Sequence, residues 1–282
     1  MKLVETSAEL LPFIAGEDGI YKMIERAGRT CYKSTDKMTD DSAKPFVERM
    51  IKSGHTAMLE HGTVYLMVKL PDDEITPSES LYHYKNNKHS VYNVANRTAY
   101  VTTNFRVLVE NEWLDDLKYL CEPTIWHEKR YTFRMVTSIG VTRELNRHGV
   151  NSIAEQSTRY CNYAKDKFGN EITFCKPVWA PDYDEADWDR FLKALFEAEN
   201  AYLGLINQGW QPQQAREVLP LCTASEIIHT AFASDWRFFF DLRLFAKTGN
   251  PHPNMLLLAQ KMKAEAEDKD VWNDIMRYHS KF

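Results

Sequence analysis

The spacing of apolar positions divides the start of the chain into two helices and a strand. Apolar residues at helical spacing predict a helix that begins near residue 17 and ends at Gly28, followed by a basic, turn-like stretch to Ser34. The same spacing predicts a second helix over residues 42–53. From residue 63 to 70 the period changes to two, which is typical of a β-strand.

The rest of the chain alternates between irregular and periodic segments. Residues 71–103 lack a clear period and end in an extended run. We then expect a helix over 105–120, a strand over 131–137, and a helix over 139–148 with Ser138 as its N-cap. A short strand over 171–176 precedes a mainly helical part, with helices at 185–208, after Pro212, at 220–233 and from 251 onward. The prediction is one α+β domain over residues 1–282, with a central mixed or antiparallel sheet flanked by helices and a helical C-terminal part.

Composition narrows the class of protein. Of the 282 residues, 44% are hydrophobic and 27% charged, as in ordinary globular proteins, and the net charge of −5 gives no general attraction to nucleic acids or anionic membranes. The five cysteines are scattered without a Cys-x-x-Cys pair, so neither a zinc site nor a disulfide framework is indicated. The first residues show no apolar h-region, so we do not expect a secretory signal, and no run of ~18 apolar residues occurs. We therefore expect a cytoplasmic protein outside the membrane.

The densest group of polar side chains lies between residues 144 and 160. If residues 139–148 are helical, Glu144, Arg147 and His148 share one face of the helix. Glu155, Ser157 and Arg159 are spaced by two, so in an extended segment they point to the same side and are able to hold a sugar–base unit and its phosphate. Tyr160 would then face the core. The alternative is an exposed helix end with ordinary salt bridges.

This stretch resembles the signature of the flavin-dependent thymidylate synthases, the ThyX family. The family signature is Arg-His-Arg, seven residues and Ser; here it is Arg147-His148-Gly149, seven residues and Ser157. Three other segments resemble the family in the expected order, and they are Gly54-His55 to Glu60-His61, Arg216-Glu217-Val218-Leu219-Pro220, and Leu242-Arg243. Gly149 replaces the usual arginine, which removes a cation from the flavin side, and Phe238 stands near a position that is usually polar. Residues 71 to about 130 form an insertion relative to the shortest members.

The resemblance implies FAD-dependent reductive methylation of dUMP to dTMP in a homotetramer with sites at subunit interfaces. Methylenetetrahydrofolate would donate the carbon, NADPH would reduce the flavin, and no enzyme nucleophile or metal would take part. Arg243 would be catalytic, stabilising negative charge on the uracil. The residues implied for FAD are His61, Thr63, Arg147, His148, Gly149 and Glu155. Those implied for dUMP are Glu144, Arg147, Glu155, Gln156, Ser157, Thr158, Arg159, Arg216 and Arg243.

Other interpretations stay open at this point. Ser157 as a nucleophile is less favoured than a binding hydroxyl, because no base lies beside it in sequence, and Cys161 is expected to be a bystander thiol. His55 and His61 lack a third ligand for a metal. Gly149 and Phe238 favour as an alternative an enzyme that modifies C5 of another pyrimidine nucleotide, by hydroxymethylation or with dCMP or UMP as substrate. A third hypothesis is a non-catalytic flavin- or RNA-binding protein that uses the basic, aromatic loop at 82–92.

Overall fold

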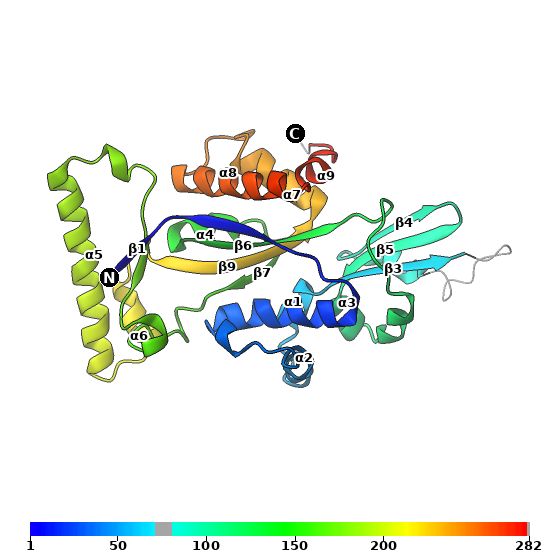
Figure 1. The fold of residues 1–282 in the computed structure, drawn as a ribbon, viewed down its shortest axis with the longest axis horizontal. Helices are drawn as coiled ribbons and strands as arrows, with labels where there is room; N and C mark the ends of the chain where they lie inside the picture. The colour runs from blue at the N-terminus through cyan, green and yellow to red at the C-terminus, as the bar shows by residue number, and fades with distance from the viewer. Residues whose placement is uncertain (71–80, 281–282) are drawn as a thin grey trace.

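A four-stranded antiparallel sheet lies at the centre of the computed structural model, which describes residues 1–70 and 81–280 (Figure 1). Its strand order is β2-β6-β9-β7, and the strands span Ser7–Leu11, Arg130–Ser138, Ala224–Phe232 and Ser152–Glu155. Strands β6 and β9 pair over nine residues each, which makes them the long central pair. This arrangement confirms the predicted α+β class with a central antiparallel sheet.

Helices cover both faces of this sheet. On one face lie α4 (Ile139–Leu145), α7 (Ala233–Arg243) and α8 (Pro253–Asp268), and on the other α1 (Gly16–Cys31) and α2 (Ala43–Lys52) (Figure 1). Side chains of β9 alternate between the two: Ile227 packs into the core with α7 and α8, and Ile228 packs against α1. We call these the α7 face and the α1 face. The short helix α9 (Trp272–Met276) packs against α7 and α8.

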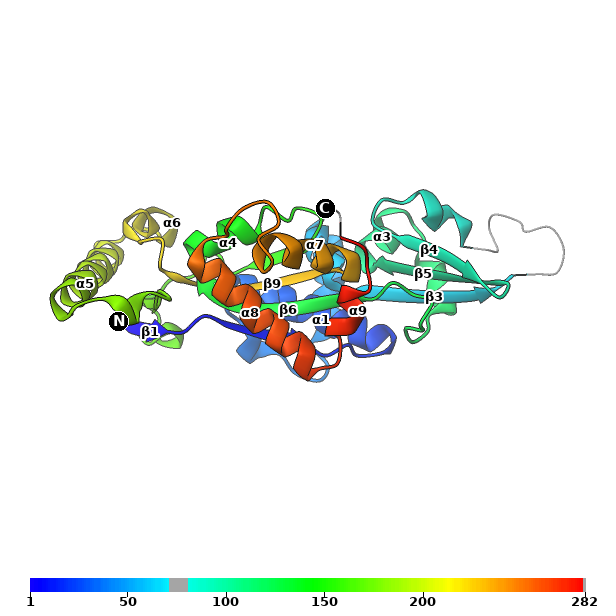
Figure 2. The same ribbon diagram turned by 90° about the horizontal axis from the view of Figure 1, so that it is seen from above.

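Two smaller units lie at opposite ends of the central sheet (Figure 2). At one end, α5 (Glu185–Asn207) and α6 (Pro212–Ala215) accompany the parallel pair of β1 (Lys2–Val4) and β8 (Thr173–Cys175). At the other, β3 (Thr63–Lys69), β5 (Thr98–Asn104) and β4 (Val91–Ala95) form an antiparallel sheet beside α3 (Phe105–Glu110). The predicted insertion supplies most of this second unit, and its residues 71–80 lie outside the described residues.

Most predicted elements are confirmed, including the helices at α1, α2, α5 and α8 and the strands at β3, β6 and β8. The Ser138 hydroxyl caps α4 by accepting a hydrogen bond from the Val141 amide, as predicted. Helix α1 continues to Cys31, so the first part of the expected basic turn is helical. Residues 82–86 form a 3-10 helix whose Tyr84 is fully buried, and its ring is therefore not available for base stacking.

Three predictions about local structure were wrong. The helix expected at 220–233 is strand β9; the strand is buried on both faces, so it shows no alternation. The helix expected at 105–120 is α3 followed by a 3-10 helix at Leu114–Tyr119. The extended segment expected to run to Arg159 ends at Glu155, and a turn follows.

Candidate functional site

Arg243 lies where the ends of α4 and α7 meet on the α7 face. Its Nη1 donates to Glu144 Oε2 at 3.0 Å, and its Nε donates to His148 Nε2 at 3.2 Å. The Arg243 and Glu144 side chains are 19% and 29% exposed, so the ion pair remains open to solvent on one side. Arg243 and Glu144 are 99 residues apart in the sequence, and the fold brings them into contact. The predicted uracil-binding cation therefore lies between a carboxylate and an imidazole.

His148 is held in its neutral form. It is buried against the Phe239 ring, with centroids 5.0 Å apart, and Phe238 lies 6.0 Å away. Burial and the Arg243 charge lower the pKa of His148 to about 4. The imidazole therefore accepts the Arg243 hydrogen bond through Nε2, and it adds no positive charge to the site near neutral pH.

Glu155 ends strand β7 on the same face. Its Oε1 accepts a hydrogen bond from the Ser225 hydroxyl at 3.0 Å, and its Oε2 accepts one from the Asn146 amide at 3.1 Å. Asn146 directly precedes Arg147 in the signature, so these bonds tie the end of α4 to β7 and β9. The carboxylate is thereby oriented without an arginine or lysine partner among the described residues.

The turn after Glu155 changes the predicted arrangement of the nucleotide-binding residues. Gln156 points to the other face, where it donates to the Tyr163 hydroxyl at 3.4 Å. The Ser157 hydroxyl accepts a hydrogen bond from the Arg159 amide at 3.2 Å. Glu155, Ser157 and Arg159 therefore do not form one extended row. Tyr160 was expected in the core and is instead 56% exposed, because the turn directs its ring outward.

Two guanidinium groups converge beside this turn. Arg216 donates to the Thr158 hydroxyl at 3.3 Å, and Arg159 donates to the Gln213 side chain at 3.0 Å. Arg216 also approaches Glu217 at 3.6 Å, in an exposed pair that contributes little. Arg159 is exposed and has no carboxylate partner among the described residues. Two arginines in this position are well suited to a phosphate, because guanidinium groups bind phosphate oxygens in pairs.

Arg147 and Gly149 lie on the exposed surface of the same corner. The Arg147 guanidinium has no ion pair or hydrogen bond to any described residue. A Cβ added to Gly149 would meet nothing within 4 Å, and the backbone there has an ordinary negative or extended φ. The missing arginine therefore leaves open space rather than a packed substitute.

His61 and Thr63 lie on the α1 face, across the sheet from Glu155 and His148. His61 is fully buried and its Nδ1 pairs with the Thr230 hydroxyl at 2.9 Å, while Thr63 accepts from buried Arg130 at 3.2 Å. Burial and the Arg130 charge lower the pKa of His61 to about 3. Both residues line a cavity of about 550 Å³ whose other walls are mainly apolar. The structure therefore divides the predicted flavin residues into two groups.

The residues on the α7 face fit the polar parts of a flavin nucleotide. Arg147, which has no ion pair among the described residues, offers a cation to a pyrophosphate, and His148 and Glu155 offer fixed hydrogen-bonding groups on the same face. His61 and Thr63 do not join them within one protomer, because the two groups lie on opposite faces of the central sheet. Successive residues of β9 point to opposite faces, and each group contacts residues of one face only.

Several residues of this site were missed from the sequence. Ser225, which orients Glu155, was hidden because its segment was predicted to be helical. Gln213 and Arg130 carried no motif that would have singled them out. Asn146 directly precedes the signature residue Arg147. This position, together with its polar side chain, was the one sequence feature that could have indicated its contact with the site. The missed residues are those that hold the predicted ones in place.

The alternative chemistries find little support in the local contacts. Cys161 is buried, its thiol lies 3.9 Å from the Cys31 carbonyl, and burial raises its pKa. No base is hydrogen-bonded to Ser157 among the described residues. Within the same residues, no three His, Cys, Asp or Glu side chains gather closely enough to hold a metal ion.

No helix in the described part of the chain is long and apolar enough to cross a membrane.

The fold is that of an α+β protein, and arginine side chains gather at this corner. The family described as thymidylate synthase complementing protein matches residues 80–270, which is more than half of the chain. The protein therefore belongs to this family, and the resemblance seen in the signature is confirmed.

Individual relatives match over shorter stretches. The flavin-dependent thymidylate synthase of Pyrococcus furiosus is 32% identical over 103 residues, 36% of this chain and 41% of that protein. That of Geobacter sulfurreducens is 29% identical over 135 residues, 46% of this chain and 55% of the relative. The chain thus spans about half the length of the curated relatives it matches. A solved structure, the UMP/dUMP methylase PolB from Streptomyces cacaoi bound with 5-Br dUMP, is 17% identical with a TM-score of 0.46, covering 99% of this chain and 98% of that one.

Proposed function

We propose that the protein methylates dUMP at C5 to give dTMP, with FAD as cofactor, methylenetetrahydrofolate as carbon donor and NADPH as reductant. The observation that carries the proposal is the Arg243 cation held between Glu144 and His148 in a member of this family. Guanidinium stays charged at any working pH, so it stabilises negative charge that develops on a uracil ring. Arg243 is the catalytic residue in this proposal, and its two partners fix its direction.

The other named residues bind and orient the nucleotide. Arg159 and Arg216 hold the phosphate, and Ser157 and Thr158 contribute hydroxyl groups on the same turn. Glu155 and Gln156 belong to the same segment, although their side chains point to opposite faces, and Gln156 contributes to the substrate contact only through its backbone. Among the residues that the structure describes, no base contacts the Ser157 hydroxyl, which supports a reaction without an enzyme nucleophile.

FAD, when bound, supplies the hydride chemistry, which the protein itself lacks. Arg147, His148 and Glu155 are the residues that would hold it, with Gly149 leaving space beside them. Since His61 and Thr63 lie on the other face, their predicted role with the same flavin requires a second subunit, which supports the proposed homotetramer. Light scattering of the purified protein tests that assembly.

Release of tritium from C5 of labelled dUMP is the direct test. The reaction is run with FAD, methylenetetrahydrofolate and NADPH, and each is omitted in turn. The proposal requires release that depends on all three together with formation of dTMP. Failure to form dTMP from dUMP by protein that binds FAD would refute it.

A second candidate is modification of C5 of another pyrimidine nucleotide, namely hydroxymethylation or the use of dCMP or UMP. Phe238 favours it, because its apolar ring adjoins His148 where the family usually has a polar residue. The same assay with dCMP and UMP, followed by mass analysis of the base, separates the two candidates. A mass gain of a hydroxymethyl rather than a methyl group would identify the alternative reaction.

A further inference from the structure

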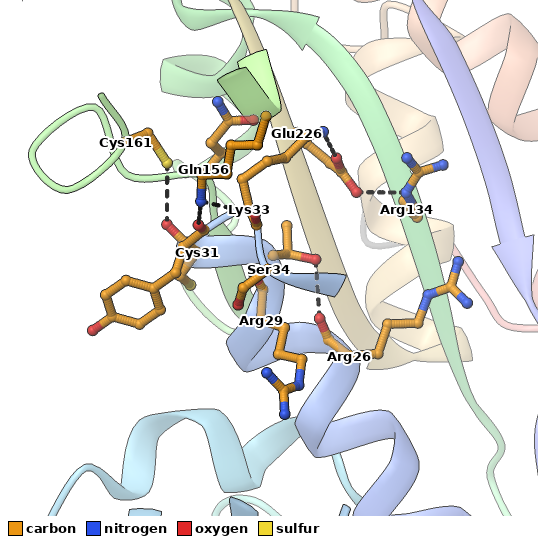
Figure 3. Close-up of polar contacts among 12 residues, drawn as sticks. Arg26, Arg29, Cys31, Lys33, Ser34, Arg134, Gln156, Cys161 and Glu226 are labelled. Carbon is orange, nitrogen blue, oxygen red and sulfur yellow. Dashed lines mark hydrogen bonds and ion pairs between the residues drawn. The ribbon is translucent and has the colours of Figure 1, made fainter. Parts of the chain in front are cut away.

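A buried carboxylate on the α1 face connects two cations from distant parts of the chain. Glu226 of β9 is only 6% exposed, and it accepts hydrogen bonds from Lys33 Nζ and from Arg134 Nε, the latter at 2.6 Å (Figure 3). Burial by itself raises the pKa of Glu226, but the two cations leave the value below its usual range. The Glu226 carboxylate therefore stays ionised. It binds Lys33, which lies 193 residues away in the sequence.

Lys33 occupies an unusual backbone conformation just after α1. Its φ of 49° lies in the left-handed region, which residues other than glycine rarely adopt. Surrounding contacts hold it there: its amide donates to Thr30 O at 3.1 Å, and Lys167 Nζ donates to the Tyr32 and Lys33 carbonyls at 2.9 and 3.1 Å. The direction of the chain at residues 31–33 is therefore fixed by the main-chain bond to the end of α1 and by the side chains of Glu226 and Lys167.

This segment supports the turn that carries Arg159. The Ser157 amide donates to Cys31 O at 2.9 Å. The centroids of the Tyr32 and Tyr160 rings are 5.4 Å apart, and the Arg159 guanidinium lies 5.1 Å from the centroid of the Tyr160 ring. A continuous series of contacts thus runs from Glu226 through Lys33 and Tyr32 to Tyr160 and Arg159.

The main chain makes a second connection to the same carboxylate residue. The Gln156 amide donates to the Glu226 carbonyl at 2.8 Å, at the point where the chain leaves β7 for the turn. Glu226 therefore fixes the entry to the turn through its backbone and supports its far end through Lys33. Both ends of the phosphate-binding turn depend on one residue of β9.

We propose that Lys33, held by Glu226, is a positioning residue that sets the place of Arg159 for the nucleotide phosphate. The inference rests on the proposed function, since it takes the phosphate of dUMP as the ligand of Arg159. In this proposal Lys33 acts through the Tyr32–Tyr160 contact, because its ammonium group is directed to Glu226. The Lys33–Glu226 pair stabilises one position of the Arg159 guanidinium, which lies on an exposed turn.

Arg134 provides a matched control. It contacts the same carboxylate from strand β6, and its other partner is Glu9, so no contact among the described residues connects it to Tyr32 or Tyr160. Lys33→Met and Arg134→Met each remove one cation from Glu226, and only the first removes the support of the turn. Lys33→Gln serves as a smaller change in case the Met variant does not fold, and Lys33→Arg restores the cation.

The measurement is the dissociation constant of dUMP by calorimetry, with deoxyuridine as the ligand that lacks the phosphate. We expect Lys33→Met to weaken dUMP binding roughly 2- to 30-fold, the range for residues that act through others, and to leave deoxyuridine binding unchanged. Arg134→Met should bind dUMP within about twofold of the unaltered protein, and Lys33→Arg should recover most of the loss. In an Arg159→Ala background the Lys33→Met effect should vanish, because the two act in one series.

The outcomes separate this inference from the function on which it rests. If unaltered protein does not bind dUMP, the proposed function and this inference both fail. If it binds dUMP but Lys33→Met and Arg134→Met weaken binding equally, or if deoxyuridine is affected as much as dUMP, the positioning role alone is refuted. An undiminished Lys33→Met effect in the Arg159→Ala background would refute it as well.

Discussion

Both faces of strand β9 carry ion pairs between basic side chains and glutamates, but these pairs differ in their exposure to solvent. On the α7 face, Arg243 and Glu144 form an ion pair that is one-fifth to one-third exposed, and Arg147 has no ion pair among the described residues. On the α1 face, Glu226 is 6% exposed and both its oxygens are taken by cations. Adjacent residues Ser225 and Glu226 serve the two faces in turn. The partly exposed cations of the α7 face suit an anionic ligand, whereas Glu226 on the α1 face connects distant parts of the chain.

The largest expected effect comes from removing the Arg243 cation of the α7 face. Arg243→Ala should lower kcat by roughly 10²–10³, the usual effect of deleting a group that stabilises charge in the transition state. The stability should change little, because the pair is partly solvated. Steady-state rates of dTMP formation and thermal unfolding of the same preparations measure the two quantities.

Arg237 is the matched control for that variant. It lies on the same helix and pairs with Asp241 at 3.2 Å, with its own side chain 14% exposed. Arg237→Ala removes an ion pair to a fully buried carboxylate outside the proposed site, so stability should fall but turnover per folded molecule should be retained. Equal losses in the two variants would mean that α7 acts only as a structural support, and that the contrast between the two faces is not functional.

Acid should weaken the fold through the histidines that both faces keep neutral. His61 on the α1 face and His229 on the α7 face are fully buried, and burial lowers the pKa of each to about 3 from an ordinary 6.5. Between these values the unfolded chain binds more protons than the folded one, so stability falls as the pH falls below 6.5. At about pH 5 each site should cost about 2 kcal/mol relative to neutral pH.

Urea unfolding at neutral pH and at about pH 5 measures this dependence. Replacing His61 by Gln removes one titrating group from the α1 face and should reduce the loss by about half of that expected for the pair. If the free energy of unfolding is the same at both pH values, the two imidazole rings are accessible to solvent in the folded protein. Burial would then not keep them neutral.

The same contrast explains what the sequence could and could not predict. Amphipathic helices such as α1 and α2 and the alternating strand β3 were found because one side of each faces solvent or a different layer. Strand β9 was mistaken for a helix because it is buried on both faces, and Ser225 and Glu226 were lost with it. The signature residues were found because their chemistry is dense and local, whereas the pairing of Lys33 with Glu226 depends on the tertiary fold.

Two serine hydroxyls test the faces with equal chemistry. Ser152 on the α1 face accepts a hydrogen bond from buried Arg130 at 3.0 Å, and Ser225 on the α7 face donates to Glu155. Ser152→Ala should cost roughly 1.5–3 kcal/mol of stability, as for a hydrogen bond to a charged group, with dUMP affinity unchanged. Ser225→Ala should cost less, about 1 kcal/mol, because Glu155 is partly exposed and keeps its hydrogen bond from Asn146. It should also weaken flavin binding through Glu155. Chemical unfolding and flavin titration give both values, and a reversed pattern would contradict the assignment of the faces.

The smallest expected effect lies at Gly149, where the family usually has arginine. A side chain added there meets nothing within 4 Å, and the backbone needs no left-handed φ, so Gly149→Arg should change stability by less than about 0.5 kcal/mol. If a flavin lies against the α7 face, the added cation should tighten its binding roughly 2- to 5-fold, because an exposed ion pair contributes at most about 1 kcal/mol. The ratio of flavin to protein absorbance after dialysis reports it, with Gly204→Arg on exposed α5 as the control for added charge. Equal flavin retention by both variants would mean that the open corner beside Arg147 does not face the cofactor, and that another residue has replaced the missing arginine.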